Sequence, residues 1–315
     1  MSTDRRITVF GGSGFIGRYV VKRLADQGWI VRVAVRDPVA AAFLKPMGDV
    51  GQIVLMKADI TDASLVAAAV SGVDAVINLV GILYEWGRQR FSAVHAEGAG
   101  RIAAAAAAAG VRRMVHVSAI GADPAFPAAY ARTKAAGEAA VRKHFANATI
   151  IRPSIVFGPE DAFFNRFAAM ACLSPVLPLI GGGHTRFQPV YVGDVAEAIV
   201  SALADKTAPG ATYELGGPKV YTFKELLQLM LAEIGRRRCL VSVPWAIARL
   251  QGAFLEWIPA PPLTRDQVRL LERDNVVASG AKGLGDLGIQ PTPVEAILPA
   301  YLGIYRRGGR SRPPR

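Results

Sequence analysis

A short apolar run followed by closely spaced glycines constrains this chain most. Residues 7–10 read as a strand, and the glycines between it and an amphipathic stretch are Gly11, Gly14 and Gly17. The first glycine of such a run permits a tight turn, the second lets the backbone approach a pyrophosphate, and the third lets a helix pack closely on the strand. The free N–H groups at the start of that helix then face the phosphates. The run predicts a dinucleotide site, against the alternative of a glycine-rich turn that holds no ligand.

The end of the second predicted strand discriminates between the nicotinamide cofactors. An acidic residue about 20 residues past the glycines bonds the ribose 2′-hydroxyl of NAD, whereas a guanidinium suits the 2′-phosphate of NADP. The strand predicted over Trp29–Asp37 has Arg36 at this place. NADP(H) is therefore the favoured cofactor. Asp37 is adjacent, and a shift by one residue would restore NAD(H) as the alternative. A further alternative is that Arg36 is only a solvated residue at the end of a strand.

Strand-like and helix-like segments alternate through the first half of the chain. Further strands are predicted at 52–56, 74–79, 113–118 and 149–152, with helices between them at 64–70, 91–109 and 129–144. Alternation of this kind specifies a parallel sheet covered by helices on both faces. We therefore predict an α/β protein with a Rossmann-like doubly wound parallel sheet.

Beyond Pro153 the alternation gives way to loops that contain proline and glycine, which predicts a smaller C-terminal lobe. We assign residues 1–160 to the Rossmann domain, which part of 186–216 completes, and we expect Gln188–Val192 to return to the main sheet. The smaller lobe takes residues 161–305, and a basic disordered tail takes 306–315. Capping-box spacing predicts three helix starts in this half, at Asp194/Glu197, Thr222/Glu225 and Thr264/Gln267.

One predicted helix, Pro244–Ile258, is apolar on nearly all sides. Its few other residues, Arg249, Gly252 and Glu256, fall on one narrow stripe. Such a helix is either buried in the lobe or docked on a membrane surface or partner. Helices that lie on membranes usually carry more lysine and arginine, which favours burial here.

The chain has a formal net charge of +12. Much of the excess lies in Arg236–Arg238 and in the tail from Arg306. No recognition module accompanies this charge, so nucleic acid is not a predicted partner. Anionic lipid or an acidic protein surface is favoured, and a tail that only adds solubility is the alternative.

Cysteine and histidine usage predicts no metal centre. The two cysteines and four histidines are scattered and lack the spacing of metal ligands. The cysteines have no paired spacing either, which fits a reducing compartment. Because the first strand begins close to Met1, we expect no signal peptide and a cytoplasmic location, with attachment to the cytoplasmic face of the inner membrane as an extension.

Tyr130 and Lys134 stand one helical turn apart near the start of the helix predicted over 129–144. A phenol can exchange a proton with a substrate oxygen during hydride transfer, while the lysine lowers the pKa of the tyrosine and holds the ribose hydroxyls. The spacing alone is common by chance, but its place after a strand that ends in Ser118 makes it specific. We predict Tyr130, Lys134 and Ser118 as catalytic residues and as contacts of the cofactor.

Together these motifs resemble the short-chain dehydrogenase/reductase superfamily, in its extended or atypical branch of epimerases and dehydratases. The resemblance implies that the pyrophosphate contacts come from Gly11, Ser13, Gly14, Phe15, Ile16 and Gly17. It further implies that the adenine is contacted by Asp59 and Ile60 and that the ribose is backed by Leu79, Val80 and Gly81.

Two later segments are also typical of this branch, Arg152–Pro159 and Val190–Ala196. The first adds Pro153 and Ile155 to the expected cofactor contacts. The third catalytic residue of the superfamily is a serine near the end of the fifth strand. In the register that best matches catalytic members Ala119 occupies its place, and Ser118 stands one residue early.

The second half resembles a narrower family, the NAD(P)H-binding accessory subunits of respiratory complex I (alpha subcomplex subunit nine), in a bacterial form. The segments that carry this are Arg152–Asn165, Phe187–Val192, Leu263–Val268 and Asp286–Pro293. The resemblance implies a tightly held NADPH used for structure and attachment to a membrane complex near its quinone region, with docking through the 244–258 helix and the basic tail. The alternative is an active NAD(P)-dependent reductase, epimerase or dehydratase that acts on a carbonyl or sugar-nucleotide substrate. Oligomeric state is not predicted.

Overall fold

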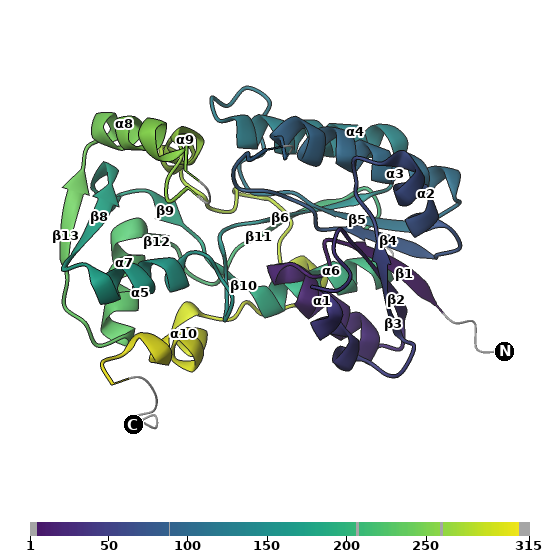
Figure 1. The fold of residues 1–315 in the computed structure, drawn as a ribbon, viewed down its shortest axis with the longest axis horizontal. Coiled ribbons are helices and arrows are strands. Elements are labelled where there is room, and N and C mark those ends of the chain that lie inside the picture. The colour runs from purple at the N-terminus through teal and green to yellow at the C-terminus, as the bar shows by residue number, and fades with distance from the viewer. Residues whose placement is uncertain (1–4, 88, 206–207, 259–260, 309–315) are drawn as a thin grey trace. The chain divides into compact units, whose positions relative to one another are not determined.

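The computed structural model describes residues 5–87, 89–205, 208–258 and 261–308. The chain divides into two compact units, whose helices and strands are labelled in Figure 1. Unit one comprises Met1–Pro153, Gly193–Leu215 and Ser279–Ile289. Unit two comprises Ser154–Val192, Gly216–Ala278 and Gln290–Arg315.

Unit one is built on a seven-stranded sheet of order β11-β6-β5-β4-β1-β2-β3, and all neighbouring strands are parallel (Figure 1). Its strands are β1 (Arg6–Phe10), β2 (Ile30–Val35), β3 (Ile53–Lys57), β4 (Ala75–Asn78), β5 (Arg113–Val117), β6 (Thr149–Pro153) and β11 (Thr212–Leu215). The strand order reverses between β1 and β4, the place where sheets of this kind bind ligands. The predicted Rossmann-like doubly wound fold is confirmed.

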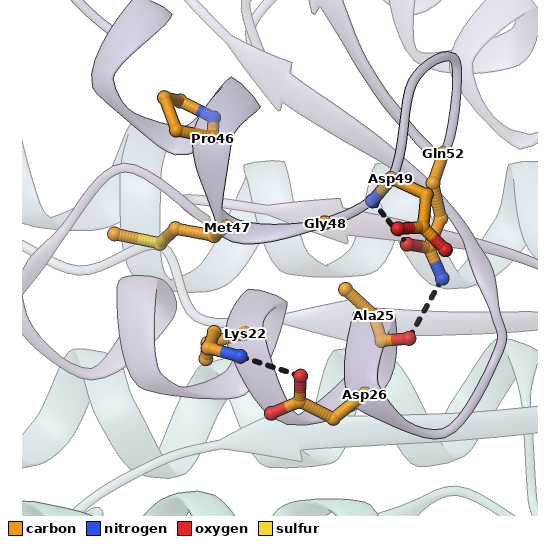
Figure 2. Close-up of a pocket in the computed structure, with 8 residues that line it drawn as sticks. All are labelled: Lys22, Ala25, Asp26, Pro46, Met47, Gly48, Asp49 and Gln52. Atoms are coloured by element: carbon orange, nitrogen blue, oxygen red, sulfur yellow. Dashed lines mark hydrogen bonds and ion pairs between the residues drawn. The ribbon is translucent and has the colours of Figure 1, made fainter.

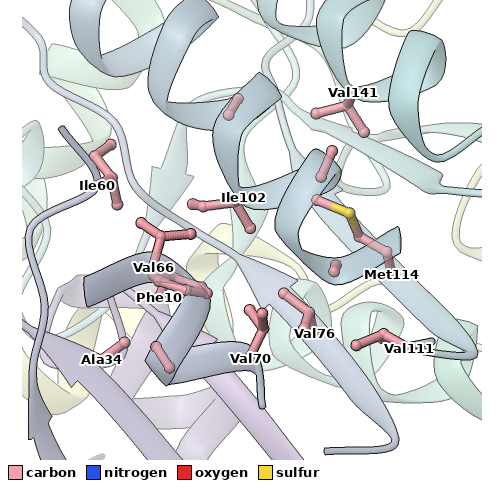
Figure 3. Close-up of a cluster of buried hydrophobic side chains, with 14 of the residues drawn as sticks. Phe10, Ala34, Ile60, Val66, Val70, Val76, Ile102, Val111, Met114 and Val141 are labelled. Atoms are coloured by element: carbon pink, nitrogen blue, oxygen red, sulfur yellow. The ribbon is translucent and has the colours of Figure 1, made fainter. Parts of the chain in front are cut away.

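Helices cover both faces of this sheet (Figure 1). One face carries α2 (Ala63–Val70), α3 (Ala99–Ala108) and α4 (Ala129–His144), and the other carries α1 (Phe15–Asp26) and α6 (Val192–Ala204). Figure 3 shows the core beneath α2, α3 and α4, which includes the side chains of Phe10, Ile102 and Met114. The alanines of α3 that join this core are Ala99, Ala103 and Ala106. Because alanine is small, the helix lies close to the sheet.

The prediction that Gln188–Val192 returns to the main sheet is wrong. β10 (Val190–Tyr191) pairs instead with β7 (Val156–Phe157) in a two-stranded sheet of unit two. The seventh position of the main sheet belongs to β11, which follows α6 and pairs along the whole of β6. The backbone groups on the outer edge of β6 are thus hydrogen-bonded by a strand that comes later in the chain.

Unit two contains two further strand pairs and its own apolar core. β8 (Val176–Ile180) pairs with β13 (Cys239–Val243) in parallel, and β9 (Arg186–Phe187) pairs with β12 (Tyr221–Thr222) in antiparallel fashion. The core is formed mainly by α5 (Phe164–Leu173), α7 (Phe223–Glu233) and α10 (Val294–Leu302). A smaller cluster joins α8 (Trp245–Leu255) to α9 (Arg265–Leu271). Short helical turns of the chain are η1 (Ala42–Met47), η2 (Ser92–Gly98), η3 (Gly181–Gly183), η4 (Gly285–Leu287) and η5 (Gly303–Tyr305).

Two of the three predicted helix starts are confirmed. Thr222 and Thr264 each cap a helix, and in each case the residue three positions on returns the hydrogen bond. The third is wrong, because α6 already begins at Val192 and Asp194 lies within its first turn. A carboxylate there still interacts favourably with the positive end of the helix dipole.

The predicted tail lies mostly outside the described residues, which end at 308. Its first residue, Arg306, donates from Nε to the Glu233 carbonyl oxygen at 2.9 Å and also pairs with the Glu233 carboxylate. No helix within the described ranges is both long enough and apolar enough to cross a membrane.

Candidate functional site

The glycine turn after β1 is closed so tightly that side chains are excluded from it. Gly11 has a φ of 77°, and a Cβ there would lie 3.2 Å from the carbonyl carbon of Leu79. A Cβ on Gly17 would lie 2.4 Å from the Gly11 carbonyl oxygen. Gly14 forms the N-cap of α1, and its N–H donates to the same oxygen at 3.0 Å. The turn therefore leaves a cradle of bare backbone before a helix N-terminus, which fits a pyrophosphate.

The predicted cofactor residues of unit one follow the carboxyl ends of five strands. The glycine run follows β1, Arg36 follows β2, Asp59 and Ile60 follow β3, the Leu79–Gly81 segment follows β4, and Ser118 follows β5. Because these strands are parallel neighbours, the residues gather at one edge of the sheet. The sequence thus predicted a set that the fold does bring to one edge.

The two remaining predicted contacts lie at the junction of the units along the chain. Pro153 ends β6, and its carbonyl oxygen accepts a hydrogen bond from the Ile120 N–H at 3.0 Å. Ile155 belongs to unit two, where its N–H donates to Asn275 Oδ1 at 3.1 Å. Its role toward a cofactor stays a prediction.

The end of β2 presents an arginine while the neighbouring acid is engaged elsewhere. Asp37 Oδ1 accepts hydrogen bonds from the N–H groups of Val39 at 2.9 Å and Ala40 at 3.0 Å, so it stabilises the following turn. Arg36 is exposed. Hydrogen bonds from Thr61 lower the pKa of Asp59, and the positive charge of Arg36 lowers it further. The charge of Arg36 therefore acts on the predicted adenine residue.

Arg18 is a second guanidinium that the sequence patterns left unassigned. It lies on the first turns of α1, and its Cζ is 5.0 Å from the centroid of the Phe43 ring in η1. The signal that could have found it is its place directly after the third glycine of the run. Phosphate recognition by proteins commonly uses more than one basic group, so Arg18 joins Arg36 as a candidate for a 2′-phosphate.

Tyr130 and Lys134 face each other on α4, as the spacing predicts. The Lys134 Nζ lies 5.9 Å from the centroid of the Tyr130 ring and donates to the Val117 carbonyl oxygen at 3.3 Å. Burial raises the pKa of Tyr130 to about 12. This direction is opposite to the predicted one, because the cost of burying a phenolate outweighs the attraction of the lysine.

The pKa of Lys134 is well below that of an ordinary lysine. Burial lowers the pKa of Lys134 to about 8, although the negative charge of Glu138 works in the other direction. Glu138 is largely committed to another partner, since its carboxylate receives two hydrogen bonds from Arg152 at 2.7 and 2.8 Å. The lysine ammonium is therefore poorly compensated until a ligand brings oxygen acceptors to it.

The segment after β5 has one buried hydroxyl, on Ser118, and the next residue has none. Ser118 is almost fully buried, and within the described ranges its Oγ has no hydrogen-bond partner. The following residue, Ala119, has only a methyl group in the place that matches the catalytic serine. Together with the glycine cradle, this orphaned Oγ fits a nicotinamide dinucleotide lying along the edge of the sheet, where Ser118 could bond to it.

A separate cavity of ≈ 420 Å³ lies between α1 and the segment after η1 (Figure 2). Two polar contacts lie in its lining: Lys22 pairs with Asp26 at 2.5 Å, and Gln52 Nε2 donates to the Ala25 carbonyl oxygen at 2.7 Å. The predicted cofactor residues are not among those that line it. It plays no part in the candidate site.

A bound nicotinamide ring supplies hydride transfer, and the residues above determine what else is available. The chain offers a turn of bare backbone that fits a pyrophosphate, a buried lysine and a tyrosine that remains protonated at neutral pH. Residues 7–216 match the model of the family described as "NAD dependent epimerase/dehydratase family". The chain belongs to this family. Membership of this family supports nicotinamide dinucleotide as the class of ligand that the chain binds.

Named relatives extend the similarity over nearly the whole chain. It is 38% identical over 96% of its length to "NADH dehydrogenase [ubiquinone] 1 alpha subcomplex subunit 9, mitochondrial" of Arabidopsis thaliana, and it covers 78% of that protein. It is 29% identical to the "Ceramide reductase" of Caulobacter vibrioides, over 81% of this chain and 80% of the relative. The predicted resemblance to complex I subunit nine is confirmed.

Solved structures agree on the fold. The dTDP-glucose 4,6-dehydratase DesIV of Streptomyces venezuelae, solved with NAD and TYD bound, superposes with a TM-score of 0.73 at 22% identity. The match covers 96% of this chain and 97% of DesIV.

Proposed function

We propose that this protein holds NADP(H) with little turnover and acts as a structural, accessory-subunit-like component of complex I or another quinone-associated respiratory assembly. The observation that carries the proposal is Ala119, whose methyl group can neither donate nor accept a proton where the superfamily has its serine. Burial also raises the pKa of Tyr130 to about 12, which makes the phenol a poor general base while leaving it protonated. The 38% identity to the Arabidopsis complex I subunit supports the assembly.

The nucleotide carried by the purified protein tests the first half of the proposal. We expect about one NADP(H) per chain after denaturation and chromatographic analysis. We also expect NADPH oxidation, with a panel of aldehydes, ketones, quinones and sugar nucleotides, to stay at least about 100-fold below the ~1 s⁻¹ at which typical enzymes begin. Ala119→Ser restores a hydroxyl and should raise this rate. A chain that neither carries nor binds a nicotinamide nucleotide contradicts the proposal.

An active reductase, epimerase or dehydratase is the second candidate. It is favoured by the juxtaposition of Tyr130 and Lys134 on α4 and by the 29% identity to the Caulobacter ceramide reductase. Tyr130→Phe separates the two candidates. It abolishes turnover in an enzyme that uses the phenol as its acid, and it leaves a structural nucleotide-loaded protein unchanged in nucleotide content.

Preference for NADP(H) over NAD(H) should depend on Arg36. We expect Arg36→Asp to weaken NADPH binding by about tenfold or more, because a charge-assisted bond to the 2′-phosphate is worth roughly 1.5–3 kcal/mol, and to improve NADH binding. Competitive titration of both nucleotides measures this. Lys143→Asp, which changes an exposed cation near the far end of α4, is the matched control and should leave the ratio unchanged. An unchanged ratio in Arg36→Asp would remove Arg36 from the phosphate site.

The outer face of α8 supplies the surface for assembly. Burial of the whole helix, which the sequence favoured, is wrong: Ala248 and Gly252 are buried, but Leu250, Phe254 and the following Trp257 are exposed. Phe254 and Trp257 are 71% and 80% accessible. The neighbouring charges neutralise one another in the pairs Arg249–Glu272 and Arg265–Glu256, both at 2.5 Å. A neutral apolar stripe of this kind fits an apolar protein surface better than anionic lipid.

Loss of this stripe should release the protein from its assembly. We expect the double change Leu250→Ser with Phe254→Ser to abolish co-purification with membrane-bound respiratory subunits while nucleotide binding persists. Val39→Ser alters an exposed valine of unit one, which is 85% accessible, and should have no effect. If the unaltered protein stays entirely in the cytoplasmic fraction and retains no respiratory subunit, attachment to the cytoplasmic face of the inner membrane is refuted.

A further inference from the structure

His95 lies in an unusual piece of backbone next to the candidate site. η2 (Ser92–Gly98) is a π-helix, a rare conformation that is frequent at functional sites. Its close approach to α4 depends on Gly137, where a Cβ would lie 2.1 Å from the His95 carbonyl oxygen. On its other side a Cβ on Gly98 would lie 2.5 Å from Ile60 Cδ1. Two glycines therefore allow η2 to pack closely, Gly137 against α4 and Gly98 against Ile60.

The hydrogen bonds of His95 determine its tautomer. Nε2 accepts a hydrogen bond from the Ile82 N–H at 3.0 Å, so the ring proton is on Nδ1. Nδ1 then donates to Thr133 Oγ1 at 3.1 Å, and that hydroxyl donates onward to the Ala129 carbonyl oxygen at 2.8 Å. Burial and the nearby charge of Lys134 lower the pKa of His95 to about 3. The ring is thus neutral and fully hydrogen-bonded at physiological pH, so it is not an acid or base.

The ring also packs on one residue of the candidate site, Tyr130. It meets the Tyr130 ring edge to face, with centroids 5.3 Å apart, and stacks on Phe91 at 5.3 Å. The loop that it holds by Ile82 includes Gly81, where a Cβ would lie only 3.2 Å from Lys134 Nζ. One side chain therefore connects the loop after β4 to Tyr130 and Thr133 of α4, and the loop that it holds lies beside Lys134.

We propose that His95 is a positioning residue for the nucleotide site: by accepting the Ile82 N–H it fixes the loop after β4 beside Lys134, and by packing on Tyr130 it sets the direction of the phenol. The inference rests on nucleotide binding at this edge of the sheet and adds a residue to it. Without the acceptor, the Ile82 N–H loses its partner in a partly buried loop. Such a loss costs enough to displace the loop from the ribose.

Two variants separate the two hydrogen bonds. A glutamine amide reaches about as far as Nε2 and an asparagine amide about as far as Nδ1. His95→Gln therefore keeps an acceptor for Ile82, whereas His95→Asn keeps a donor for Thr133 and leaves Ile82 unbonded. We expect NADPH affinity to fall by about tenfold in His95→Asn and to stay within about threefold in His95→Gln. His144→Asn, at the exposed end of α4, is the control and should match the unaltered protein.

The melting temperature without nucleotide distinguishes positioning from general support. If His95 had a merely structural role, its substitution would lower the melting temperature and the NADPH affinity in parallel. Comparable melting temperatures for the two variants, combined with different NADPH affinities, therefore support the proposal. Equal affinities in His95→Gln and His95→Asn overturn it. Failure of the unaltered protein to bind NADPH overturns the proposed function instead, which keeps the two outcomes apart. Nitrogen NMR of the imidazole supplies a further check, and a ring protonated on Nε2 contradicts the assigned tautomer.

Discussion

Gly17→Ala is expected to abolish nucleotide binding and to destabilise unit one by roughly 3 kcal/mol or more. The new Cβ would lie 2.4 Å from the Gly11 carbonyl oxygen and 2.6 Å from the Gly12 Cα. Both of these are backbone atoms, so the turn itself must open and no side chain can move aside. An opened turn no longer presents its N–H groups to a pyrophosphate. Urea unfolding and NADPH titration measure the two effects.

Two other glycines isolate the cause of this effect. Gly285→Ala introduces a Cβ with no atom within 4 Å, in a conformation that other residues adopt freely, and should change stability by less than about 0.5 kcal/mol. Gly28→Ala also meets open space but has a φ of 76°, so it should cost about 1 kcal/mol without altering NADPH affinity. Normal NADPH affinity in Gly17→Ala would refute the assigned cradle.

The alternating strands and helices in the first half of the chain could be predicted because their sequence signals are local. The helix predicted over 129–144 is observed as α4 with the same bounds, and the strands differ from prediction by a residue or two at their ends. A buried parallel strand is marked by its own apolar run and by the helices on either side of it. The carboxyl ends of these strands, and hence most of the candidate site, follow from that order alone.

The partner of the β6 edge could not be read in the same way. Both Gln188–Val192 and the observed β11 are short and lack a strong period, so nothing within either segment says which one completes the sheet. Pairing of β11 with β6 is a long-range contact made after α6 has crossed the sheet. The capping error at Asp194 has a related origin, because an acid in the first turn of a helix resembles one at its cap.

Properties that depend on three-dimensional burial also escaped prediction. The outer stripe of α8 is as apolar as a core, and only packing reveals that Ala248 faces inward while Leu250 does not. The π-helix around His95 has no local signal in the sequence. The pKa of Tyr130 is raised because the phenol is buried, and a Tyr/Lys spacing contains no measure of burial.

Stability of the nucleotide-free protein should rise with pH between about 8 and 10. Lys134 has its pKa lowered from 10.5 to about 8 in the folded chain, so in this range the unfolded chain binds more protons than the folded one. Stability increases with pH whenever that is so. A displacement of this size corresponds to roughly 3 kcal/mol, present in full only above the unfolded pKa. Urea unfolding across this pH range gives the slope.

Above about pH 10 the sign reverses. Burial raises the pKa of Tyr130 from 10.0 to about 12, so the unfolded chain now loses a proton that the folded chain keeps, and stability falls. Tyr221 and Tyr305, whose pKa values are also raised, add to the fall. Tyr130→Phe should therefore reduce this decline without removing it.

Lys134→Met assigns the rise to one side chain. It replaces a buried ammonium with an apolar side chain of similar length, so we expect higher stability at pH 7 and a nearly flat profile between pH 8 and 10. Lys143→Met, on the exposed side of the same helix, should keep the rise. The same substitution at 134 should weaken NADPH binding, because it removes the ammonium that we expect to donate to the ribose hydroxyls. If the stability of Lys134→Met still rises between pH 8 and 10, the titrating group lies elsewhere. Greater stability combined with weaker NADPH binding would identify Lys134 as a group that destabilises the nucleotide-free fold and stabilises the bound nucleotide.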